Sequence, residues 1–279
     1  MKSFRGRVAA VTGAGSGIGR AVAIELAREG AHLALSDVDG DGLAETVALV
    51  ERETSGIKVT SERVDVADRR AVAAWADAVA EAHGQVNLVV NNAGVTVGAT
   101  AERLTPDDFH WLMDIDFWGV VHGTQAFLPH LKASGEGHVV NISSVFGLVS
   151  IPGQAGYNAA KFAVRGFSDA LRIELEIEEA PVSVTTIHPG GIKTNIARNA
   201  RMDESVTGIG TDLDTFTDEF DRLARTSPEK AAQQILRAVR RNRRRALIGP
   251  DAVVFDLMSR LPAGLYQRLL VFDGRRRLR

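Results

Sequence analysis

The 279-residue sequence predicts a doubly wound α/β fold, in which a seven-stranded, mostly parallel sheet has helices on both faces and a helical extension at the C-terminus. Two observations lead to this prediction. Short runs rich in Val, Ile and Leu alternate with longer segments of helical period, which is typical of parallel strands joined by right-handed crossovers. No repeat or low-complexity linker interrupts the alternation, so we expect residues 1–250 to form one domain.

Each predicted strand is short, apolar and bounded by turn residues, and the seven are 7–13, 31–37, 58–65, 86–94, 137–144, 182–190 and 245–249. Six intervening segments have helical period: 17–29, 40–54, 68–83, 106–133, 153–178 and 227–242. The last helix has a clear start, with Ser227 as N-cap and Pro228 in the first helical position.

Two stretches depart from this alternation. Residues 193–226 are polar and too long for a tight connection, so we expect short helices that form a lid or loop over the substrate. Residues 251–279 predict an amphipathic helical extension, broken at Leu261 and Pro262, with a basic tail at its end. Two alternatives stay open: the extension covers the domain or makes an oligomer contact, which we favour, or it touches a membrane surface.

Composition excludes several classes of function. A net charge of −2 argues against nucleic acid as a partner, because phosphate binding needs a basic face. The absence of cysteine excludes disulfides and thiolate sites and is compatible with a reducing cytoplasm, and the seven histidines lack ligand spacing, so no metal is expected. Without a signal-peptide pattern or a long apolar run, we expect a soluble, cytoplasmic protein.

A glycine-rich loop, "TGAGSGIG" at residues 12–19, follows the first strand and opens the first helix. Glycines there allow backbone to approach a diphosphate, and the helix N-terminus supplies free N–H donors. Asp37 ends the second strand 20 residues after Gly17, the spacing at which a carboxylate binds the adenosine ribose in a Rossmann fold.

Asp37 also indicates which dinucleotide binds. Its charge would repel a 2′-phosphate, and neither Val38 nor residues 12–19 supply a compensating Arg or Lys. The sequence therefore favours NAD over NADP.

One of the two tyrosines, Tyr157 in "GYNAAKF", lies four residues before Lys161, which places both on one face of a helix. The spacing alone arises by chance in about 4% of such chains, so it needs support from other motifs.

That support comes from the order of further motifs, "VDVAD", "NNAG", "NISS" and "HPGGIKT", which together resemble the short-chain dehydrogenase/reductase family over roughly residues 5–250. "NISS" places Ser144 thirteen residues before Tyr157, the interval found in the family. The resemblance implies a set of cofactor-binding residues: Gly13, Ser16, Gly17, Ile18, Gly19, Asp37, Asp65, Val66, Asn92, Ala93, Gly94, Tyr157, Lys161, Ile192 and Thr194. Asp65 and Val66 would contact the adenine, and Ile192 and Thr194 the nicotinamide amide.

The resemblance implies an NAD(H)-dependent oxidoreductase that interconverts a secondary alcohol and a ketone, with Tyr157 as acid and base. The ordinary tyrosine pKa near 10 must fall by about three units, worth roughly 4 kcal/mol. Lys161, with the positive nicotinamide of oxidised cofactor, would supply this, and Lys161 would also bind the nicotinamide ribose. Ser144 would hydrogen-bond the substrate oxygen. A homodimer or homotetramer is expected by resemblance.

One position departs from the family, which usually has Asn where this chain has Asp116. A carboxylate near Lys161 would stabilise the ammonium but offset its effect on Tyr157, so Asp116 is expected to take part in catalysis and to raise the pH optimum.

Two other functions are compatible with the fold. A catalytically silent NAD-binding regulatory or scaffold protein would be expected to lose Ser144, Tyr157 or Lys161, whereas this chain retains all three. A sugar epimerase or dehydratase would need a larger C-terminal substrate domain. An apolar substrate is suggested by a group of apolar residues near the predicted site: Trp111, Trp118, Val145, Phe146, Leu148 and Val149.

Overall fold

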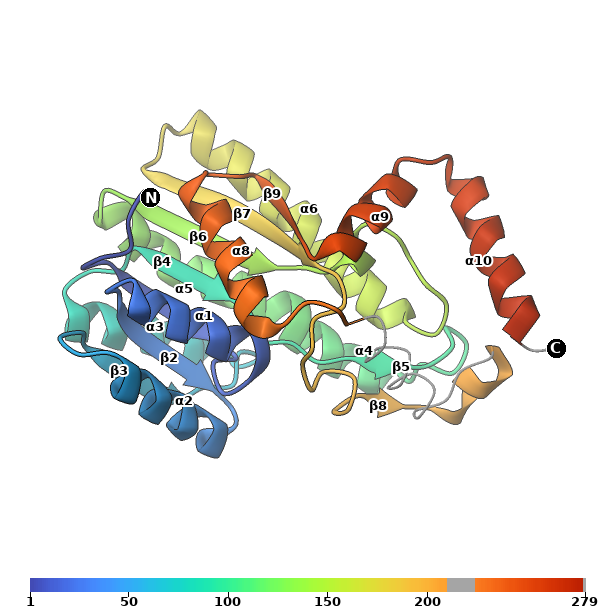
Figure 1. Cartoon of the computed structure of the whole chain (residues 1–279), viewed down its shortest axis with the longest axis horizontal. Helices are drawn as coiled ribbons and strands as arrows, with labels where there is room; N and C mark the ends of the chain where they lie inside the picture. The colour runs from blue at the N-terminus through green and yellow to red at the C-terminus, as the bar shows by residue number, and fades with distance from the viewer. Residues whose placement is uncertain (210–223, 278–279) are drawn as a thin grey trace.

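The computed structural model describes residues 1–209 and 224–277, so the central part of the predicted lid and the last two residues of the basic tail lie outside the described residues. One sheet of seven parallel strands has the order β3-β2-β1-β4-β6-β7-β9 (Figure 1). Its strands are β1 (Val8–Thr12), β2 (His32–Asp37), β3 (Val59–Arg63), β4 (Leu88–Asn91), β6 (Gly137–Ile142), β7 (Val182–Pro189) and β9 (Arg245–Ile248). The predicted fold class is confirmed, with every pair in this sheet parallel.

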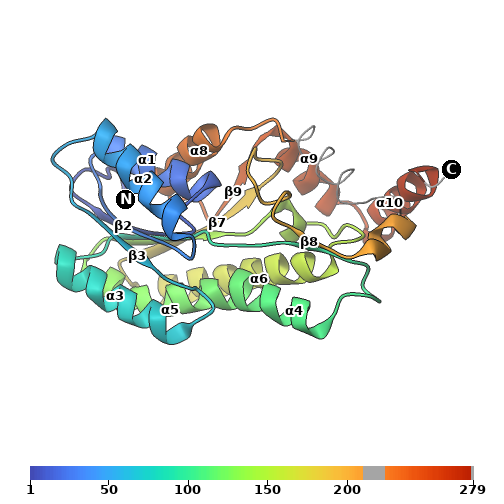
Figure 2. The same ribbon diagram turned by 90° about the horizontal axis from the view of Figure 1, so that it is seen from below.

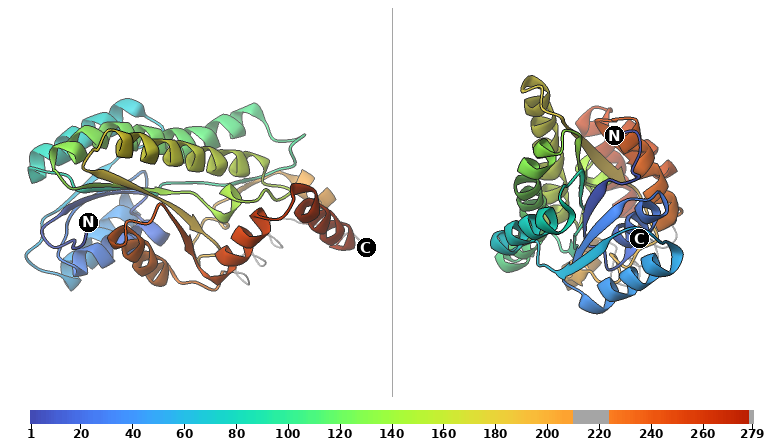
Figure 3. Two further views of the ribbon diagram at one scale, coloured as in Figure 1. Left: turned by 90° about the horizontal axis from the view of Figure 1, so that it is seen from above. Right: turned by 90° about the vertical axis from the view of Figure 1, so that its left-hand side faces the viewer.

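Helices cover both faces of the sheet in two layers (Figures 2 and 3). One layer contains α1 (Gly17–Arg28), α2 (Gly40–Glu53) and α8 (Pro228–Arg240). The other contains α3 (Arg69–His83), α4 (Pro106–Met113), α5 (Gly119–Ala133) and α6 (Ala155–Ile177). Because successive strand residues point to opposite faces, Val139 and Val140 enter different hydrophobic clusters, one under each helical layer.

The predicted helical segment over 106–133 is helical throughout, but it is not regular. A π-helical segment, η1 (Asp114–Trp118), separates α4 from α5. Such wide turns occur mostly as short insertions within α-helices and often at functional sites. Here the segment carries Asp116, which is fully buried. Gly119 follows it, where a Cβ would lie only 2.8 Å from Cγ2 of Val66, so a larger residue does not fit.

Short elements surround the carboxyl edge of the sheet. A two-stranded sheet pairs β5 (Val97–Gly98) with β8 (Arg201–Met202), and η3 (Glu204–Ile209) is a 3-10 helix. A second 3-10 segment, η2 (Val145–Gly147), follows β6. The described part of the predicted lid therefore contains a short strand as well as helix.

The C-terminal extension contains two helices, α9 (Pro250–Ser259) and α10 (Ala263–Arg277), separated at the predicted break. α10 projects from the body of the molecule and ends far from the N-terminus (Figures 1 and 3). Its apolar side chains are exposed, including Leu265 at 47%, Leu269 at 53% and Phe272 at 71%. α10 therefore does not add these side chains to the core. Among the described helices, none is both long enough and apolar enough to cross a bilayer.

Candidate active site

The glycine-rich loop joins β1 to the N-terminus of α1. Gly13 and Gly17 have φ angles of +63° and +52°, in the left-handed region that other residues seldom adopt. At Gly19 a side chain would overlap the Gly13 carbonyl and the Asn92 amide. Ser16 is the N-cap residue of α1, and the partly buried Ile18 packs against the core. The glycines therefore leave open backbone at the positive end of α1, where a diphosphate would bind.

The loop is fixed to the neighbouring strand by Thr12 and Asn92. The Thr12 hydroxyl accepts the N–H groups of Asn92 at 2.9 Å and Ala93 at 3.1 Å. The Asn92 amide donates to the carbonyls of Thr12 at 2.9 Å and Gly13 at 3.1 Å. These bonds join the ends of β1 and β4, the switch point at which doubly wound sheets bind nucleotides.

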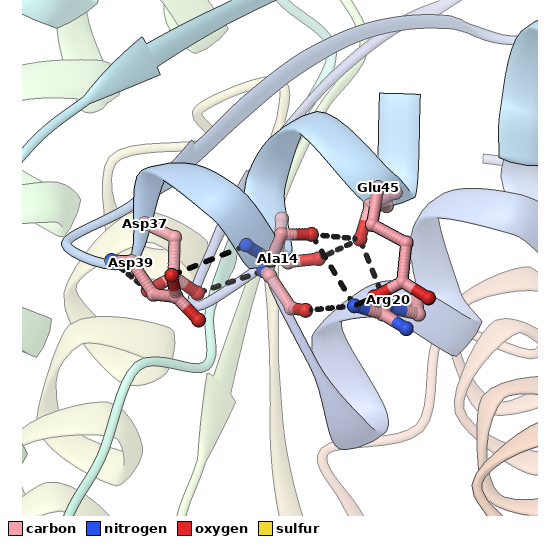
Figure 4. Close-up of polar contacts among 8 residues, drawn as sticks. Ala14, Arg20, Asp37, Asp39 and Glu45 are labelled. Atoms are coloured by element: carbon pink, nitrogen blue, oxygen red, sulfur yellow. Dashed lines mark hydrogen bonds and ion pairs between the residues drawn. The ribbon is translucent and has the colours of Figure 1, made fainter. Parts of the chain in front are cut away.

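Asp37 lies beside the loop, where its carboxylate accepts the N–H of Gly15 at 2.7 Å and of Asp39 at 2.9 Å (Figure 4). Val64 donates its N–H to the Asp37 carbonyl at 3.1 Å, which brings the "VDVAD" segment to the same edge. In that segment Asp65 is exposed and accepts the Ala67 N–H, while Val66 is buried.

Two arginines near Asp37 were missed by sequence reasoning. Arg20 donates to the Gly15 carbonyl at 2.5 Å and to Glu45 at 2.6 Å, linking the loop to α2 (Figure 4). Arg63 is paired in register with Asp37 on the adjacent strand and donates to the Val38 carbonyl at 2.9 Å. Arg63 lies 26 positions beyond Asp37 in the sequence, and only the pairing of β2 with β3 brings it to this edge.

The predicted catalytic residues meet where β6 and α6 approach each other. Lys161 is buried, and its Nζ lies 5.4 Å from the centroid of the Tyr157 ring and 3.3 Å from the Ile142 carbonyl. Ser143 donates its hydroxyl to the Lys161 carbonyl at 2.8 Å, which fixes α6 against the end of β6. Ser144 follows Ser143 at the end of β6, and its side chain acts to lower the pKa of Tyr157.

Asp116 joins this group from the π-helical segment. Its Oδ2 lies 2.9 Å from the Lys161 Nζ, and its Oδ1 accepts the Val95 N–H at 2.7 Å. A Cβ placed on Gly94 would lie 3.4 Å from Asp116 Oδ1 and 3.5 Å from the Lys161 Nζ. Gly94 therefore lies directly against the ion pair.

Burial and charge act in opposite directions on these pKa values. Burial raises the pKa of Asp116, although Lys161 opposes the shift. Burial lowers the pKa of Lys161, but the charges of Asp116 and Tyr157 raise it by more, so the net shift is upward. Burial also raises the pKa of Tyr157. Lys161 and the Ser144 side chain lower this pKa and Asp116 raises it, and the net shift is upward. Asp116 thus counteracts Lys161 at Tyr157.

The loop after β7 reaches back to the glycine-rich loop. Ile192 is 2% exposed, and a Cβ on Gly17 would lie 3.1 Å from the Thr194 methyl group. Gly191 donates its N–H to Asp251, on α9, at 2.6 Å. Sequence reasoning missed Asp251, since only folding brings α9 to this loop.

His188 was also missed by sequence reasoning, and it contacts the backbone of Ser144. Its Nδ1 lies 2.8 Å from the Ser144 carbonyl. Burial lowers the pKa of His188 to about 4, although the bond to Ser144 opposes the shift.

The apolar residues expected near the substrate have several different locations. Val145, Leu148 and Val149 are buried, so they belong to the core. Trp118 is 47% exposed and stacks on His122, while Trp111 stacks against the guanidinium of Arg201.

Phe146 is the member of that set that lies at the site. Its ring packs edge-on against Tyr157 at 6.2 Å and against Phe255 of α9 at 6.0 Å. A hollow of about 630 Å³ lies next to this region, bounded by Thr100, Ala101, residues 150–153, Ala155, Asn158, Ala159, Phe162 and Ile209. Tyr157 and Ser144 do not line it, so the hollow is separate from the predicted catalytic residues.

The residues present fit a nicotinamide dinucleotide. Three features lie along one edge of the sheet: glycine backbone with no room for side chains, the Asp37 carboxylate at the end of β2, and the loop after β7. Among residues 1–209 and 224–277, no group of three or more His, Asp or Glu side chains could hold a metal ion.

Comparisons with known proteins agree with this geometry. A Mycobacterium tuberculosis protein named as the oxidoreductase SadH is 52% identical over 271 residues, which cover 97% of this chain and 96% of that protein. A short-chain dehydrogenase/reductase from Burkholderia phymatum, solved in complex with NAD, has a TM-score of 0.83 and 32% identity, covering 92% of this chain and 94% of its own. Levodione reductase has a TM-score of 0.78 and 29% identity, covering 90% and 99%.

Residues 7–205 match the short chain dehydrogenase family directly. The chain has a Rossmann-like fold and belongs to the short-chain dehydrogenase/reductase family of oxidoreductases.

Proposed function

We propose that the protein is an NAD(H)-dependent oxidoreductase that interconverts a secondary alcohol and a ketone. The observation that carries the proposal is the meeting of Tyr157 and Lys161 beside Ser144, with the ammonium 5.4 Å from the centroid of the tyrosine ring and the Ser144 side chain lowering the pKa of Tyr157. The NAD complex of one structural neighbour and the name of a second, levodione reductase, support the cofactor and the carbonyl substrate.

Each residue has a role that follows from its position. Ser144 donates a hydrogen bond to the substrate oxygen and stabilises charge that develops there. Tyr157 removes the alcohol proton in oxidation and returns it in reduction. When bound, the dinucleotide accepts or supplies the hydride.

Lys161 and Asp116 set the proton affinity of Tyr157. The ammonium favours the tyrosinate, and the carboxylate 2.9 Å from that ammonium opposes this effect. In the protein alone the pKa of Tyr157 is raised, so proton removal near neutral pH depends on the added positive charge of the oxidised nicotinamide. A high pH optimum for oxidation follows.

We propose that the dinucleotide site prefers NAD to NADP. The Asp37 carboxylate, held by the N–H groups of Gly15 and Asp39, would repel a 2′-phosphate. Arg20 is already paired with Glu45 at 2.6 Å, so its charge is neutralised. Arg63 is the exposed cation beside this position.

An apolar substrate is supported by Phe146, whose ring packs edge-on against Tyr157. We propose a ketone or secondary alcohol with an apolar body rather than a sugar.

The proposal includes a cytoplasmic homodimer or homotetramer in which residues 1–250 form the cofactor-binding and catalytic domain. Ile173 and Ile177 on the outer face of α6 are 55% and 77% exposed, which favours burial of this face between subunits. Light scattering after size-exclusion chromatography tests the oligomer, and a monomer at micromolar concentration would contradict it.

The activity is tested with a panel of secondary alcohols and ketones, assayed with NAD and NADP in parallel through NADH fluorescence. Turnover of apolar members with NAD is expected. Tight NADH binding without turnover across the whole panel would instead favour a catalytically silent binding protein.

A further inference from the structure

We propose that Asp251, the second residue of α9, is a positioning residue that holds residues 189–194 in the shape that binds the nicotinamide half of the cofactor. The inference rests on the proposed function, because it takes this loop as the nicotinamide side of the site. It makes the C-terminal extension a part of the active site.

Three backbone N–H groups fix the loop on either side of Ile192. Gly190 donates to the Ile248 carbonyl at 2.9 Å, and Lys193 donates to the Thr226 carbonyl at 3.0 Å. Gly191 donates to Asp251 Oδ2 at 2.6 Å, across 60 residues of sequence. The first two acceptors are backbone carbonyls, which any sequence supplies, whereas the third is a charged side chain that depends on residue 251.

Two glycines make room for this carboxylate. At Gly190 a Cβ would overlap the carboxyl group of Asp251. Gly249 has a φ of +93°, and a Cβ there would lie 2.7 Å from Asp251 Oδ1. The backbone on both sides of the carboxylate therefore lacks side chains at the places where they would displace it.

A simpler role for Asp251 would be to stabilise the start of α9 through the helix dipole. The start of α8 shows this simpler case, because Glu229 follows Pro228 as Asp251 follows Pro250. The pKa of Glu229 is lowered by Ser227, the N-cap residue of the same helix, and by the helix backbone at Glu229 itself. Asp251 instead bonds to the loop after β7.

The second carboxylate oxygen also sets Asp251 apart. Oδ1 is buried and has no hydrogen-bond partner among the described residues. Burying an unpaired carboxylate oxygen is unfavourable. A carboxylate that only stabilised the start of a helix could stay at the surface and avoid this cost. The contact with Gly191 is the feature that requires the carboxylate to be buried there.

A shift of Gly191 would act first on the nicotinamide side of the site. Ile192 and Thr194 follow it directly, and the Thr194 methyl group already lies against Gly17. The adenosine side is held separately, by the bonds of Asp37 to Gly15 and of Asn92 to Gly13. Loss of Asp251 should therefore weaken NADH binding and spare binding of ADP-ribose, which lacks the nicotinamide.

The test compares NADH affinity, measured by fluorescence, with ADP-ribose affinity, measured by calorimetry. In Asp251→Ala we expect the Kd for NADH to rise about tenfold, while the Kd for ADP-ribose stays within about twofold. Asp251→Asn should raise the NADH Kd about threefold, because an amide oxygen still accepts the Gly191 N–H without a charge. Glu229→Ala, the matched helix-start control, should change neither Kd.

Equal weakening of both ligands, or an unchanged NADH Kd in both Asp251 variants, would overturn the proposal. If Asp251→Ala does not fold, Asp251→Asn carries the test, and a wild-type NADH Kd in that variant overturns it. The readout needs no turnover. A wild-type protein that binds NADH but converts no substrate would therefore refute the proposed function while leaving the role of Asp251 open to measurement by binding.

Discussion

Asp116 Oδ2 lies 2.9 Å from Lys161 Nζ, and both side chains are almost completely buried. The ion pair stands at the catalytic group, where the family usually has an uncharged Asn in place of Asp116. A negative charge there stabilises the ammonium and raises the pKa of Tyr157, so two neighbouring residues have opposite effects on the proposed acid and base.

Replacement of Asp116 by Asn should therefore move the pH profile. The variant removes a charge that raises the pKa of Tyr157, so the acidic limb of kcat/KM for alcohol oxidation should shift by about one pH unit to lower pH. The profile is measured from pH 6 to 10.5 at saturating NAD. A rate and profile identical to the wild type would remove the Asp116 side chain from the mechanism.

Replacement of Asp37 by Ser should change the cofactor preference. Without the carboxylate, the ratio of kcat/KM with NADP to that with NAD should rise by about 10- to 100-fold, because the like charge facing a 2′-phosphate is gone. Adding Arg63→Gln should reverse part of the gain, since Arg63 is the cation at that edge. Asp41→Asn, in the first turn of α2, is the control. An unchanged ratio in Asp37→Ser would contradict the assignment.

Two buried histidines should make folding sensitive to acid. Burial lowers the pKa of His138 to about 3 and that of His188 to about 4. An unfolded histidine has a pKa of about 6.5, so below that pH the unfolded chain binds more protons than the folded one. Their contribution is complete above pH 6.5 and is lost as pH falls, by about 1.4 kcal/mol per pH unit for each histidine down to about pH 4.

Urea unfolding at pH 7, 5.5 and 4.5 measures this loss. His138→Gln, which lies away from the site, should reduce the slope of the unfolding free energy against pH by about 1.4 kcal/mol per pH unit below about pH 5.5. The same slope in the variant and the wild type would show that His138 does not supply it.

Replacement of Phe255 should weaken substrate binding and leave cofactor binding unchanged. Phe255 packs on Phe146, which in turn packs on Tyr157. Phe255→Ala should raise KM for an apolar substrate about three- to tenfold, in line with the loss of one aromatic pair, and leave the NADH Kd unchanged. Val254→Ala, on the same helix and 56% exposed, is the control. A KM unchanged by Phe255→Ala would exclude the aromatic contact from substrate binding.

The sheet and most of its helices could be predicted because each element has its own periodicity and turn residues. The glycine-rich loop, Asp37 and the pair of Tyr157 and Lys161 were identified by local spacing, and the structure places the pair on one face of α6. The predicted roles of these residues stay predictions until they are measured.

The missed features depend on contacts between distant segments. Asp251 and Gly191 meet across 60 residues, and Arg63 approaches Val38 from an adjacent strand. The π-helical turn at Asp116 has no signal in apolar periodicity, because one extra residue in a turn leaves the pattern on both sides helical. Such contacts are fixed by tertiary packing and not by the local sequence.

The role of Tyr157 is the central claim, and a comparison of turnover with cofactor binding in Tyr157→Phe tests it most directly. The substitution removes the hydroxyl and keeps the ring that packs on Phe146. We expect kcat to fall by a factor of about 10² to 10⁴ with the NADH Kd within about threefold of the wild type. Turnover at the wild-type rate in this variant would contradict the account.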